Sequence, residues 1–320
     1  MNWPNADADT RPLAIAIMGP TASGKTAFAV DLAQQLNTEI ISVDSALVYR
    51  GLNIGSAKPD AETLKLAPHR LIDIREPHEI FSAADFANEA LPHMQELSGQ
   101  GKVPLLVGGT GLYFKALLKG LSAMPASNPD VRAELQTRVT LEGWQALYEQ
   151  LQAVDPISAA RIHPNDPQRI LRALEVYLVS GKSLSQWQAS SQQQPFPFRV
   201  LELVLSPQDR CVLHERIVLR FDQMLEQGFL AEMQGLMKNP LLHPDLPSMR
   251  AVGYRQAWQH LKGDINFDAF RNLAIIATRQ LAKRQLTWFR GQSSSHWLDP
   301  QAQKDALNCL VRNFTNRIDK

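Results

Sequence analysis

Hydrophobic and polar positions divide residues 13–36 into three parts. The apolar run Leu13–Met18 comes first, eight small or polar residues follow, and apolar side chains then recur at Ala27, Phe28, Val30, Leu32 and Leu36. An unbroken apolar run predicts a buried strand, whereas apolar residues three or four positions apart predict an amphipathic helix. This part of the chain is therefore expected to form a strand, a tight turn and a helix.

The same two patterns alternate along the rest of the chain. Short apolar segments predict further strands at Glu39–Val43, Arg70–Ile74, Val103–Val107, Val200–Leu205 and His296–Leu298. Helical patterns predict helices near 60–66, from 82 to about 99, over 112–118, 130–141, 143–154 and 167–180, from 207 to 227, in two or three segments up to 292, and from 299 onward. Strands that alternate with helices over short connections predict an α/β fold with a mostly parallel sheet.

Local signals predict several helix boundaries. Ser82 and Asp85 have the spacing of a capping box, and Pro92 is expected to kink or end the helix that they begin. Ser206 is the expected N-cap of a later helix, with Pro207 and Asp209 in its first turn and residue 228 as its stop.

Residues 121–198 differ in texture from the sequence around them. A stretch rich in Ser, Ala, Pro and Asn covers 122–129, helical patterns follow, and the segment 190–198 reads SSQQQPFPF. Flexible composition at both ends of a helical region predicts an inserted all-helical domain. The expected organisation is the first part of an α/β core over 1–120, the insertion over 121–198, and the second part of the core over 199–320.

Composition narrows the class of protein. The 320 residues are 44% hydrophobic and 20% charged, which is typical of a globular protein with a core, and the net charge of +1 excludes a generic polycation. Cys211 and Cys309 lie too far apart to suggest a disulfide framework or metal-ligand spacing. No apolar run approaches the ~18 residues that span a bilayer. We therefore expect a cytoplasmic protein with no membrane partner, and a monomer, because nothing argues for an obligate interface.

The turn after the first strand has the sequence of a P-loop. The motif G-x-x-x-x-G-K-T is formed by Gly19, Pro20, Thr21, Ala22, Ser23, Gly24, Lys25 and Thr26. Its glycines let successive N–H groups face an anion, the helix N-terminus and Lys25 add positive charge, and Thr26 can ligate Mg2+. Because a strand and a helix flank the motif as it requires, we expect a di- or triphosphate group to bind here.

A carboxylate follows the second predicted strand. Asp44 and Ser45 are expected at the carboxyl end of a strand beside the P-loop strand, where ligands of such folds bind. A carboxylate there could ligate Mg2+ through water or act as a general base, and a turn cap is the alternative. Nucleotide-hydrolysing P-loop proteins usually have a second strand that ends in Asp. Here the candidate strand at 104–107 runs into Gly108 and Gly109, and Asp73 is a weak substitute, so the hydrolytic machinery is a weak signal.

Residues 249–290 concentrate positive charge. They contain eight Lys or Arg residues (Arg250, Arg255, Lys262, Arg271, Arg279, Lys283, Arg284 and Arg290) against Asp264 and Asp268, with Tyr254, Trp258, Trp288 and Phe289 between them. Such clustering in a nearly neutral protein favours a phosphate-rich partner, the alternative being a solvated helix face. The two tryptophans are assigned to the core. The insertion carries further arginines that could clamp a large substrate.

These residues together resemble the tRNA dimethylallyltransferase family. The segments that carry the resemblance are, in chain order, Gly19–Thr26, Ser42–Ser45 with Tyr49, Gly55–Pro59, Pro68–Arg70, Gly108–Tyr113, His163–Arg169, Gly253–Arg255 and Arg279–Trp288. The similarity spans about 13–298, and eight segments in the same order make coincidence hard to credit. Ser56 stands where many members have Thr, which keeps the hydroxyl.

The resemblance implies a fold and a reaction. The fold would be a P-loop NTPase-like parallel-sheet core with a helical insertion that contacts the tRNA anticodon stem-loop. The reaction would transfer a dimethylallyl group from dimethylallyl diphosphate to N6 of the adenine 3′ of the anticodon (position 37), in tRNAs that read codons beginning with U, and release diphosphate. Mg2+ is the implied cofactor. Because the broken bond is carbon–oxygen and no phosphoryl group moves, the second Asp is not needed.

The resemblance also implies roles for individual residues. Asp44 would be the base that deprotonates the adenine N6, with Lys25, Thr26 and Thr110 as the other catalytic residues. Residues 19–26 would hold the diphosphate, and Thr26 the metal. The implied tRNA-binding residues are Asp44, Ser45, Ala46, Leu47, Thr110, Arg132, Gln168, Arg169, Arg250, Gly253, Tyr254, Arg255, Lys283, Arg284 and Arg290.

Two other classes of function are considered. A P-loop kinase of small molecules would explain the P-loop and Asp44, but not the basic stretch at 249–290. A non-catalytic RNA-binding protein with a vestigial P-loop would explain the basic stretch alone. Transfer of label from dimethylallyl diphosphate to tRNA, or of the γ-phosphate of ATP to a small acceptor, separates the three hypotheses.

Overall fold

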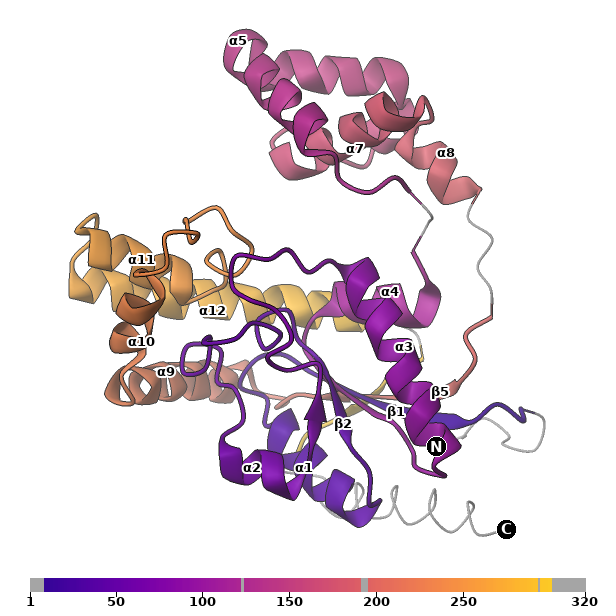
Figure 1. Ribbon diagram of the computed structural model, residues 1–320, viewed down its shortest axis with the longest axis vertical. Coiled ribbons are helices and arrows are strands. Elements are labelled where there is room, and N and C mark those ends of the chain that lie inside the picture. Colours follow the sequence, from indigo (N-terminus) through magenta and orange to yellow (C-terminus); the bar gives the residue numbers. More distant parts are fainter. Residues whose placement is uncertain (1–8, 122–123, 191–194, 293, 301–320) are drawn as a thin grey trace. The chain divides into compact units, whose positions relative to one another are not determined.

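The computed structural model describes residues 9–121, 124–190, 195–292 and 294–300 (Figure 1). The chain divides into two compact units, a core unit formed by 1–118 and 196–320 and a second unit at Lys119–Pro195. The expected insertion at 121–198 differs from the second unit by two or three residues at each end. The last helix expected from Asp299 falls largely outside the described residues.

A six-stranded sheet forms the centre of the core unit. Its strands are β1 (Leu13–Met18), β2 (Ile40–Val43), β3 (His69–Arg70), β4 (Leu105–Gly108), β5 (Arg199–Leu205) and β6 (His296–Leu298). Their order is β3-β2-β4-β1-β5-β6, and every neighbouring pair is parallel. The expected α/β fold with a parallel sheet is therefore confirmed.

Alternate side chains of the central strands face two separate clusters. In β1, Ile15 and Ile17 pack with the buried side of α1 (Lys25–Gln35), while Ala14, Ala16 and Met18 belong to the larger cluster on the other face. That larger cluster also receives side chains from α3 (Ala83–Gly99), α4 (Gly111–Lys119), α9 (Arg210–Glu226), α10 (Phe229–Leu236), α11 (Tyr254–Lys262) and α12 (Phe267–Arg290). Burial on both faces explains why the strands read as continuous apolar runs rather than as alternating ones.

The second unit is all-helical and has a core of its own. Its helices are α5 (Pro129–Val154), α6 (Pro156–Ala159), α7 (Pro167–Ser180) and α8 (Leu184–Ala189). Gly143 interrupts α5 with φ 80° and ψ 167°, so this element consists of the two helices expected at 130–141 and 143–154. The fully buried carboxylate of Glu175 accepts hydrogen bonds from the Ser127 hydroxyl and the Asn128 N–H, which ties the start of α5 to α7.

The predicted position of the second strand is wrong in one respect. β2 does not lie beside the P-loop strand β1, because β4 pairs with both of them and separates them. Asp44 therefore follows a strand that is two positions from β1 in the sheet. Sequence order alone could not show this, because a crossover places a later strand between two earlier ones.

The strand expected at 70–74 ends after Arg70. Leu71 and Asp73 have φ values of 61° and 55°, which lie in the left-handed region and break the extended backbone. The Asp73 carboxylate accepts a hydrogen bond of 2.5 Å from the buried Nζ of Lys58, which holds the bend. Asp73 therefore has a structural partner in the segment 55–59.

Two expectations about helix boundaries are also corrected. Asp209, not Ser206, is the N-cap of α9, because its carboxylate accepts a hydrogen bond from the Cys211 N–H. Pro92 does not end α3, which continues to residue 99. The carbonyl that Pro92 leaves without an intrahelical partner belongs to Asn88, which is exposed, so water can satisfy it.

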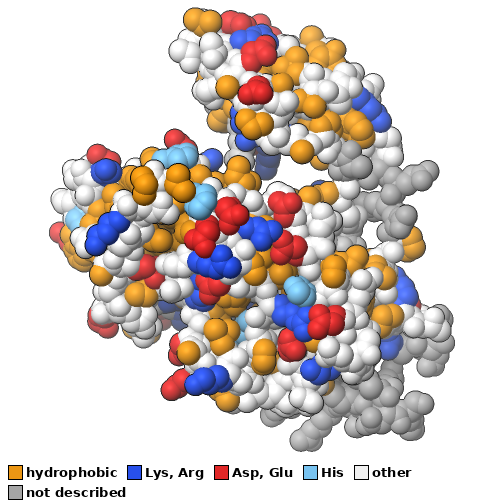
Figure 2. All heavy atoms as spheres, viewed as in Figure 1, with side chains coloured by type: hydrophobic (Ala, Val, Ile, Leu, Met, Phe, Trp, Pro, Cys, Tyr) orange, Lys and Arg blue, Asp and Glu red, His pale blue; other side chains and the backbone are white. Residues whose placement is uncertain are grey.

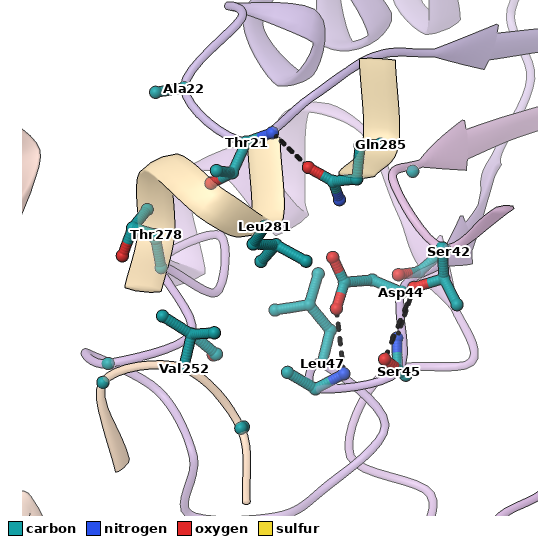
Figure 3. A pocket seen from close by; sticks show the side chains of 18 of the residues that line it. Thr21, Ala22, Ser42, Asp44, Ser45, Leu47, Val252, Thr278, Leu281 and Gln285 are labelled. Carbon is teal, nitrogen blue, oxygen red and sulfur yellow. Dashed lines mark hydrogen bonds between the residues drawn. The ribbon is translucent and has the colours of Figure 1, made fainter. Parts of the chain in front are cut away.

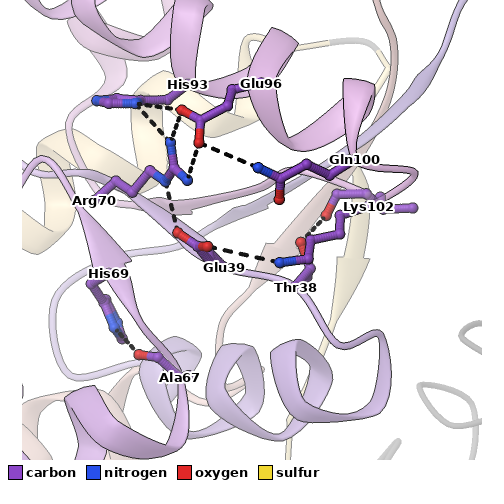
Figure 4. Close-up of polar contacts among 10 residues, drawn as sticks. Thr38, Glu39, Ala67, His69, Arg70, His93, Glu96, Gln100 and Lys102 are labelled. Carbon is purple, nitrogen blue, oxygen red and sulfur yellow. Dashed lines mark hydrogen bonds and ion pairs between the residues drawn. The ribbon is translucent and has the colours of Figure 1, made fainter.

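The short edge strand β3 is fastened by an ion-pair network around Arg70 (Figure 4). The guanidinium donates from Nε to Glu39 at 2.7 Å and from its two terminal nitrogens to Glu96 of α3 at 2.5 and 2.9 Å. These bonds raise the pKa of Arg70 and lower the pKa of Glu96. Elsewhere on this face of the core unit, acidic and basic side chains are interspersed (Figure 2).

Candidate functional site

A cavity of about 450 Å³ lies at the carboxyl edge of the sheet (Figure 3). Its lining comes from the P-loop, the segment that follows β2, the loop that follows β4, the inner faces of α9 and α12, and the segment before α11. The lining residues that the sequence singled out are Thr21, Ala22, Lys25, Thr26, Asp44, Ser45, Ala46, Leu47, Thr110, Arg250, Gly253, Tyr254 and Arg284. Every lining residue belongs to the core unit.

The P-loop forms one end of this cavity. Ala22 and Gly24 have φ values of 62° and 90°, which turn the backbone into α1, whose N-cap is Gly24. The hydroxyl of Ser23 is buried and has no hydrogen-bond partner among the described residues. A buried polar group without a partner is costly, so this hydroxyl suits an anion that would supply the missing acceptor.

Three charged groups face one another across the cavity. Burial lowers the pKa of Lys25 to about 8, while the charge of Asp44 opposes that shift and the charge of Arg220 adds to it. Burial also lowers the pKa of Arg220, against the opposing effect of Asp44. Two partly desolvated cations with one carboxylate nearby are arranged to bind a ligand with several negative charges.

Asp44 and Thr110 are positioned by the backbone around them. Asp44 Oδ1 accepts a hydrogen bond of 2.9 Å from the Ala46 N–H, and the carboxylate points into the cavity (Figure 3). The Thr110 hydroxyl accepts from the Ser45 N–H at 3.1 Å, and the Thr110 N–H donates to the carbonyl of Val43 at 3.2 Å. The loop after β4 therefore supports the segment that carries Asp44.

Arg220 is a site residue that the sequence analysis missed. It lies on α9 one turn from the buried Ile217, and it lines the cavity within the electrostatic influence of Asp44. Arg216, one turn earlier, donates to the carbonyl of Ser23 at 3.5 Å. The feature of the sequence that could have identified Arg220 is its pairing with Arg216, four residues earlier, close to the apolar face of an amphipathic helix.

The basic and aromatic side chains of the core unit that are expected to bind tRNA differ in exposure. Arg250, Arg255, Lys283 and Arg284 are exposed, and none of them forms an ion pair with a carboxylate in the described part of the chain. Arg290 is exposed and stacks on Trp297. Tyr254 is fully buried, and its hydroxyl donates to Glu232 at 2.6 Å, so it acts from within the wall of the cavity.

Glu232 anchors one wall of the cavity and was also missed. Its carboxylate accepts hydrogen bonds from the backbone N–H groups of Asn53, Ile54 and Gly55, at 3.0, 2.7 and 3.2 Å. A side chain at Gly55 would lie 2.2 Å from Phe229, so glycine is required there. The segment Gly55–Pro59 is thereby held against α10 and Tyr254.

Three further candidates lie in the helical unit. Arg132, Gln168 and Arg169 are all exposed, and Arg169 pairs with Asp166 at 3.2 Å. Arg132 lies 3.5 Å from the buried Glu175. These residues belong to the second unit, and none of them lines the cavity.

The donor set around the P-loop fits Mg2+ only in the presence of a phosphate ligand. The described residues contain no cluster of three or more His, Cys, Asp or Glu side chains that could hold a metal by themselves. Thr26 and Asp44 both line the cavity. Because Mg2+ is commonly held by one or two protein groups together with substrate phosphates and water, these two residues fit it.

The cavity combines three chemical properties. Its P-loop end can bind phosphate oxygens, its apolar residues Ile217, Phe221 and Leu281 can receive a hydrocarbon group, and Asp44 can accept a proton. The arrangement can therefore bind a phosphorylated apolar molecule beside a proton acceptor.

No helix among the described residues combines the length and apolarity that a membrane span needs.

Sequence comparison identifies relatives over nearly the whole chain. A model of the family described as IPP transferase matches residues 47–292. Two proteins of Stenotrophomonas maltophilia, strains K279a and R551-3, both named tRNA dimethylallyltransferase, are 54% identical over 314 residues, which is 97% of this chain and 99% of each relative.

Solved structures show the same similarity. The full-length tRNA isopentenylpyrophosphate transferase of Bacillus halodurans has 37% identity and a TM-score of 0.70, with 97% of each chain covered. A eukaryotic dimethylallyltransferase described as acting on tRNA has 26% identity and a TM-score of 0.78, over 94% of this chain and 80% of its own.

Proposed function

This chain belongs to the IPP transferase family and has the activity of a tRNA dimethylallyltransferase, and from that premise we propose how its residues carry out the transfer. The kinase and the non-catalytic RNA-binding protein are set aside. The proposed donor is dimethylallyl diphosphate. The proposed acceptor is N6 of the adenine 3′ of the anticodon, at position 37, in tRNAs that read codons beginning with U.

The proposed reaction is one displacement at carbon. The adenine N6 forms a bond to the first carbon of the dimethylallyl group, the bond from that carbon to the diphosphate oxygen breaks, and diphosphate leaves. Asp44 accepts the N6 proton. The observation that carries this proposal is that one cavity is lined both by the P-loop with Lys25 and by the Asp44 carboxylate, whose charge acts on Lys25.

The P-loop end holds the leaving group. Negative charge grows on the diphosphate as the carbon–oxygen bond breaks, and preorganised donors at that position lower the barrier. The P-loop N–H groups, the Ser23 hydroxyl, Lys25 and Arg220 are the donors in this chain that can act there. Thr26, together with the phosphate oxygens, would hold Mg2+, which supplies further charge neutralisation when bound.

The tRNA is proposed to bind over two sets of exposed cations. One set is Arg250, Arg255, Lys283, Arg284 and Arg290 of the core unit, and the other is Arg132 and Arg169, with Gln168, of the helical unit. Lys and Arg side chains that contact phosphates supply most of the salt-dependent affinity for nucleic acid. The target adenine is stacked within the anticodon loop, so it has to be extruded to reach Asp44.

Other residues that line the cavity would contact the extruded base. Ser45, Ala46, Leu47 and Thr110 surround Asp44, and Gly253 with Tyr254 closes the other side. We further propose that the protein acts in the cytoplasm and as a monomer.

A transfer assay tests the proposal. The protein is incubated with Mg2+, dimethylallyl diphosphate labelled in the alkyl group, and unmodified tRNA that has adenine 3′ of the anticodon. Label is expected in the tRNA, and a matched tRNA with guanine at that position should remain unlabelled. Unlabelled product with both tRNAs would refute the proposed donor and acceptor.

A further inference from the structure

The side chain of Gln285 connects the loops that follow strands β1 and β4. Its Oε1 accepts a hydrogen bond of 2.9 Å from the Thr21 N–H in the P-loop (Figure 3), and its Nε2 donates one of 3.0 Å to the carbonyl of Gly109. We propose that Gln285 is a positioning residue that sets the donor-holding loop relative to the acceptor-holding loop. This inference rests on the proposed function.

The chemistry of both contacts requires an amide. A backbone N–H can only donate and a carbonyl can only accept, so one arm of the side chain must offer an oxygen and the other an N–H group. An ionised Glu cannot donate to Gly109, and Lys cannot accept from Thr21. Asn offers both groups, but its side chain is one methylene shorter, so its amide would not extend as far from α12. Gln is therefore the residue that satisfies both loops from this position.

The contact depends on glycines in the 108–111 loop. A Cβ on Gly109 would lie 2.4 Å from Gln285 Nε2 and 3.2 Å from the carbonyl oxygen of Gly19, so the two loops touch directly. A Cβ on Gly111 would lie 2.4 Å from Trp288, one turn further along α12. The loop at 108–111 therefore lies flat against α12 because its glycines leave room for these two side chains.

The bridge links the loop that would hold the leaving group to the loop that supports the base. Thr21 belongs to the loop that binds the leaving diphosphate, and Gly109 precedes Thr110, whose hydroxyl accepts from the N–H of Ser45 beside Asp44. Hydrogen bonds thus run from the P-loop through Gln285 to the segment that carries the base. A misplacement of about 1 Å between reacting groups can reduce a rate about 100-fold. Gln285 need not touch either substrate to have this effect.

Gln285 ties both loops to one rigid element, the helix α12. α12 is held in the core by Ala282, Leu286 and Phe289, all buried, on either side of Gln285 in sequence. Groups on a packed helix hold their geometry better than groups on loops. The P-loop and the 108–111 loop would each be free to shift slightly without this reference point.

Four variants test the bridge. Gln285→Ala removes both links, Gln285→Glu retains an acceptor for Thr21, and Gln285→Lys retains a donor for Gly109. Gln280→Ala, at an exposed position of the same helix, is the matched control. Steady-state transfer gives kcat and the KM of each substrate, and the wild-type rate in the same assay tests the proposed function separately.

The three Gln285 variants are expected to lose about 100-fold in kcat, with each KM within about threefold of wild type. The control should match wild type. Because Glu and Lys carry opposite charges, a purely electrostatic effect would move them in opposite directions from the alanine variant, and that result would overturn the bridge. A kcat within about threefold of wild type for either single-link variant would also overturn it.

Hydrogen exchange provides a readout that does not depend on turnover. In Gln285→Ala, amides in 19–26 and 108–111 are expected to exchange faster than in the control, while those of β2 remain unchanged. Equal exchange in both variants would refute the inference. Gly109→Ala is an independent route to the same perturbation, because its methyl group would displace the Gln285 amide, and it should reproduce the loss of kcat.

Discussion

The lowered pKa of Lys25 predicts an alkaline limit to donor capture. Burial brings this pKa from 10.5 to about 8, so roughly half of the free enzyme carries a neutral Lys25 at pH 8 and about nine-tenths does at pH 9. A neutral amine cannot neutralise a phosphate. The kcat/KM for dimethylallyl diphosphate is therefore expected to fall about tenfold per pH unit above about pH 8.

The value of kcat should behave differently from kcat/KM. Bound diphosphate places negative charge beside Lys25 and raises its pKa, so kcat at saturating donor should remain constant to higher pH. The last ionisation of a phosphate group lies near pH 6, below this range, so the charge of the donor does not change during the titration. Initial rates of label transfer between about pH 7 and pH 9.5, at several donor concentrations and saturating tRNA, give both profiles.

Lys25→Arg is the matched control for this profile. Arginine stays protonated throughout the range, so the alkaline limb of kcat/KM should disappear even if the absolute rate is lower. Deprotonation of Lys25 does not itself destabilise the fold, because a lysine with a lowered pKa binds more protons in the unfolded chain between about 8 and 10.5, and its contribution to stability therefore rises with pH there. A flat wild-type profile, or an identical limb in Lys25→Arg, would refute the reasoning.

Three further predictions concern other parts of the molecule. Asp44→Ala should reduce kcat by about 100- to 10,000-fold through loss of the base, while the Kd for tRNA measured by filter binding stays within about threefold. Replacing Lys283 and Arg284 together by Gln should weaken tRNA binding and reduce the slope of log K against log salt by about 1 to 2. Arg70→Ala should lower the Tm by about 2–4 °C, because the edge strand β3 loses its ties to Glu39 and Glu96. Since the pKa of Glu96 is lowered in the folded state, this difference should be complete above pH 4.5 and should shrink as the pH falls through the lowered value.

Each of these predictions has an outcome that contradicts it. An Asp44→Ala enzyme with a near-normal rate would assign the base elsewhere. Lys238→Gln removes an exposed charge outside the basic stretch and serves as the control. If the salt slope falls equally in this variant, Lys283 and Arg284 belong to a solvated helix face and do not contact the tRNA. An Arg70→Ala protein with an unchanged Tm would show that the network adds no net stability.

Local chemistry was predictable from the sequence wherever a short segment determines it. The P-loop, the capping box at Ser82 and Asp85, and the break at Gly143 depend on residues within one or two turns of each other. The strand order was not predictable in this way. β4 enters between β1 and β2 through hydrogen bonds between distant segments, and no short pattern encodes that choice.

The missed site residues share a physical cause. Arg220 and Glu232 lie on helices whose patterns read as ordinary amphipathic ones, whereas Gln285 lies in a segment noted for its charge and its family resemblance. The roles of all three come from groups more than a hundred residues away. The N-cap at Asp209 was missed because Ser206 and Pro207 form an equally good local signal. Only tertiary structure decides between such alternatives.

The position of β1 in the sheet has a consequence for the order of synthesis. β1 pairs over its whole length with β5, which begins at Arg199, and the P-loop is further held by Gln285. A nascent chain that ends within the helical unit therefore has β1 as an open sheet edge, which is a template for pairing with other chains. The helical unit, with its own buried core, can fold in that interval. The first functional loop to leave the ribosome is thus among the last to reach its final form.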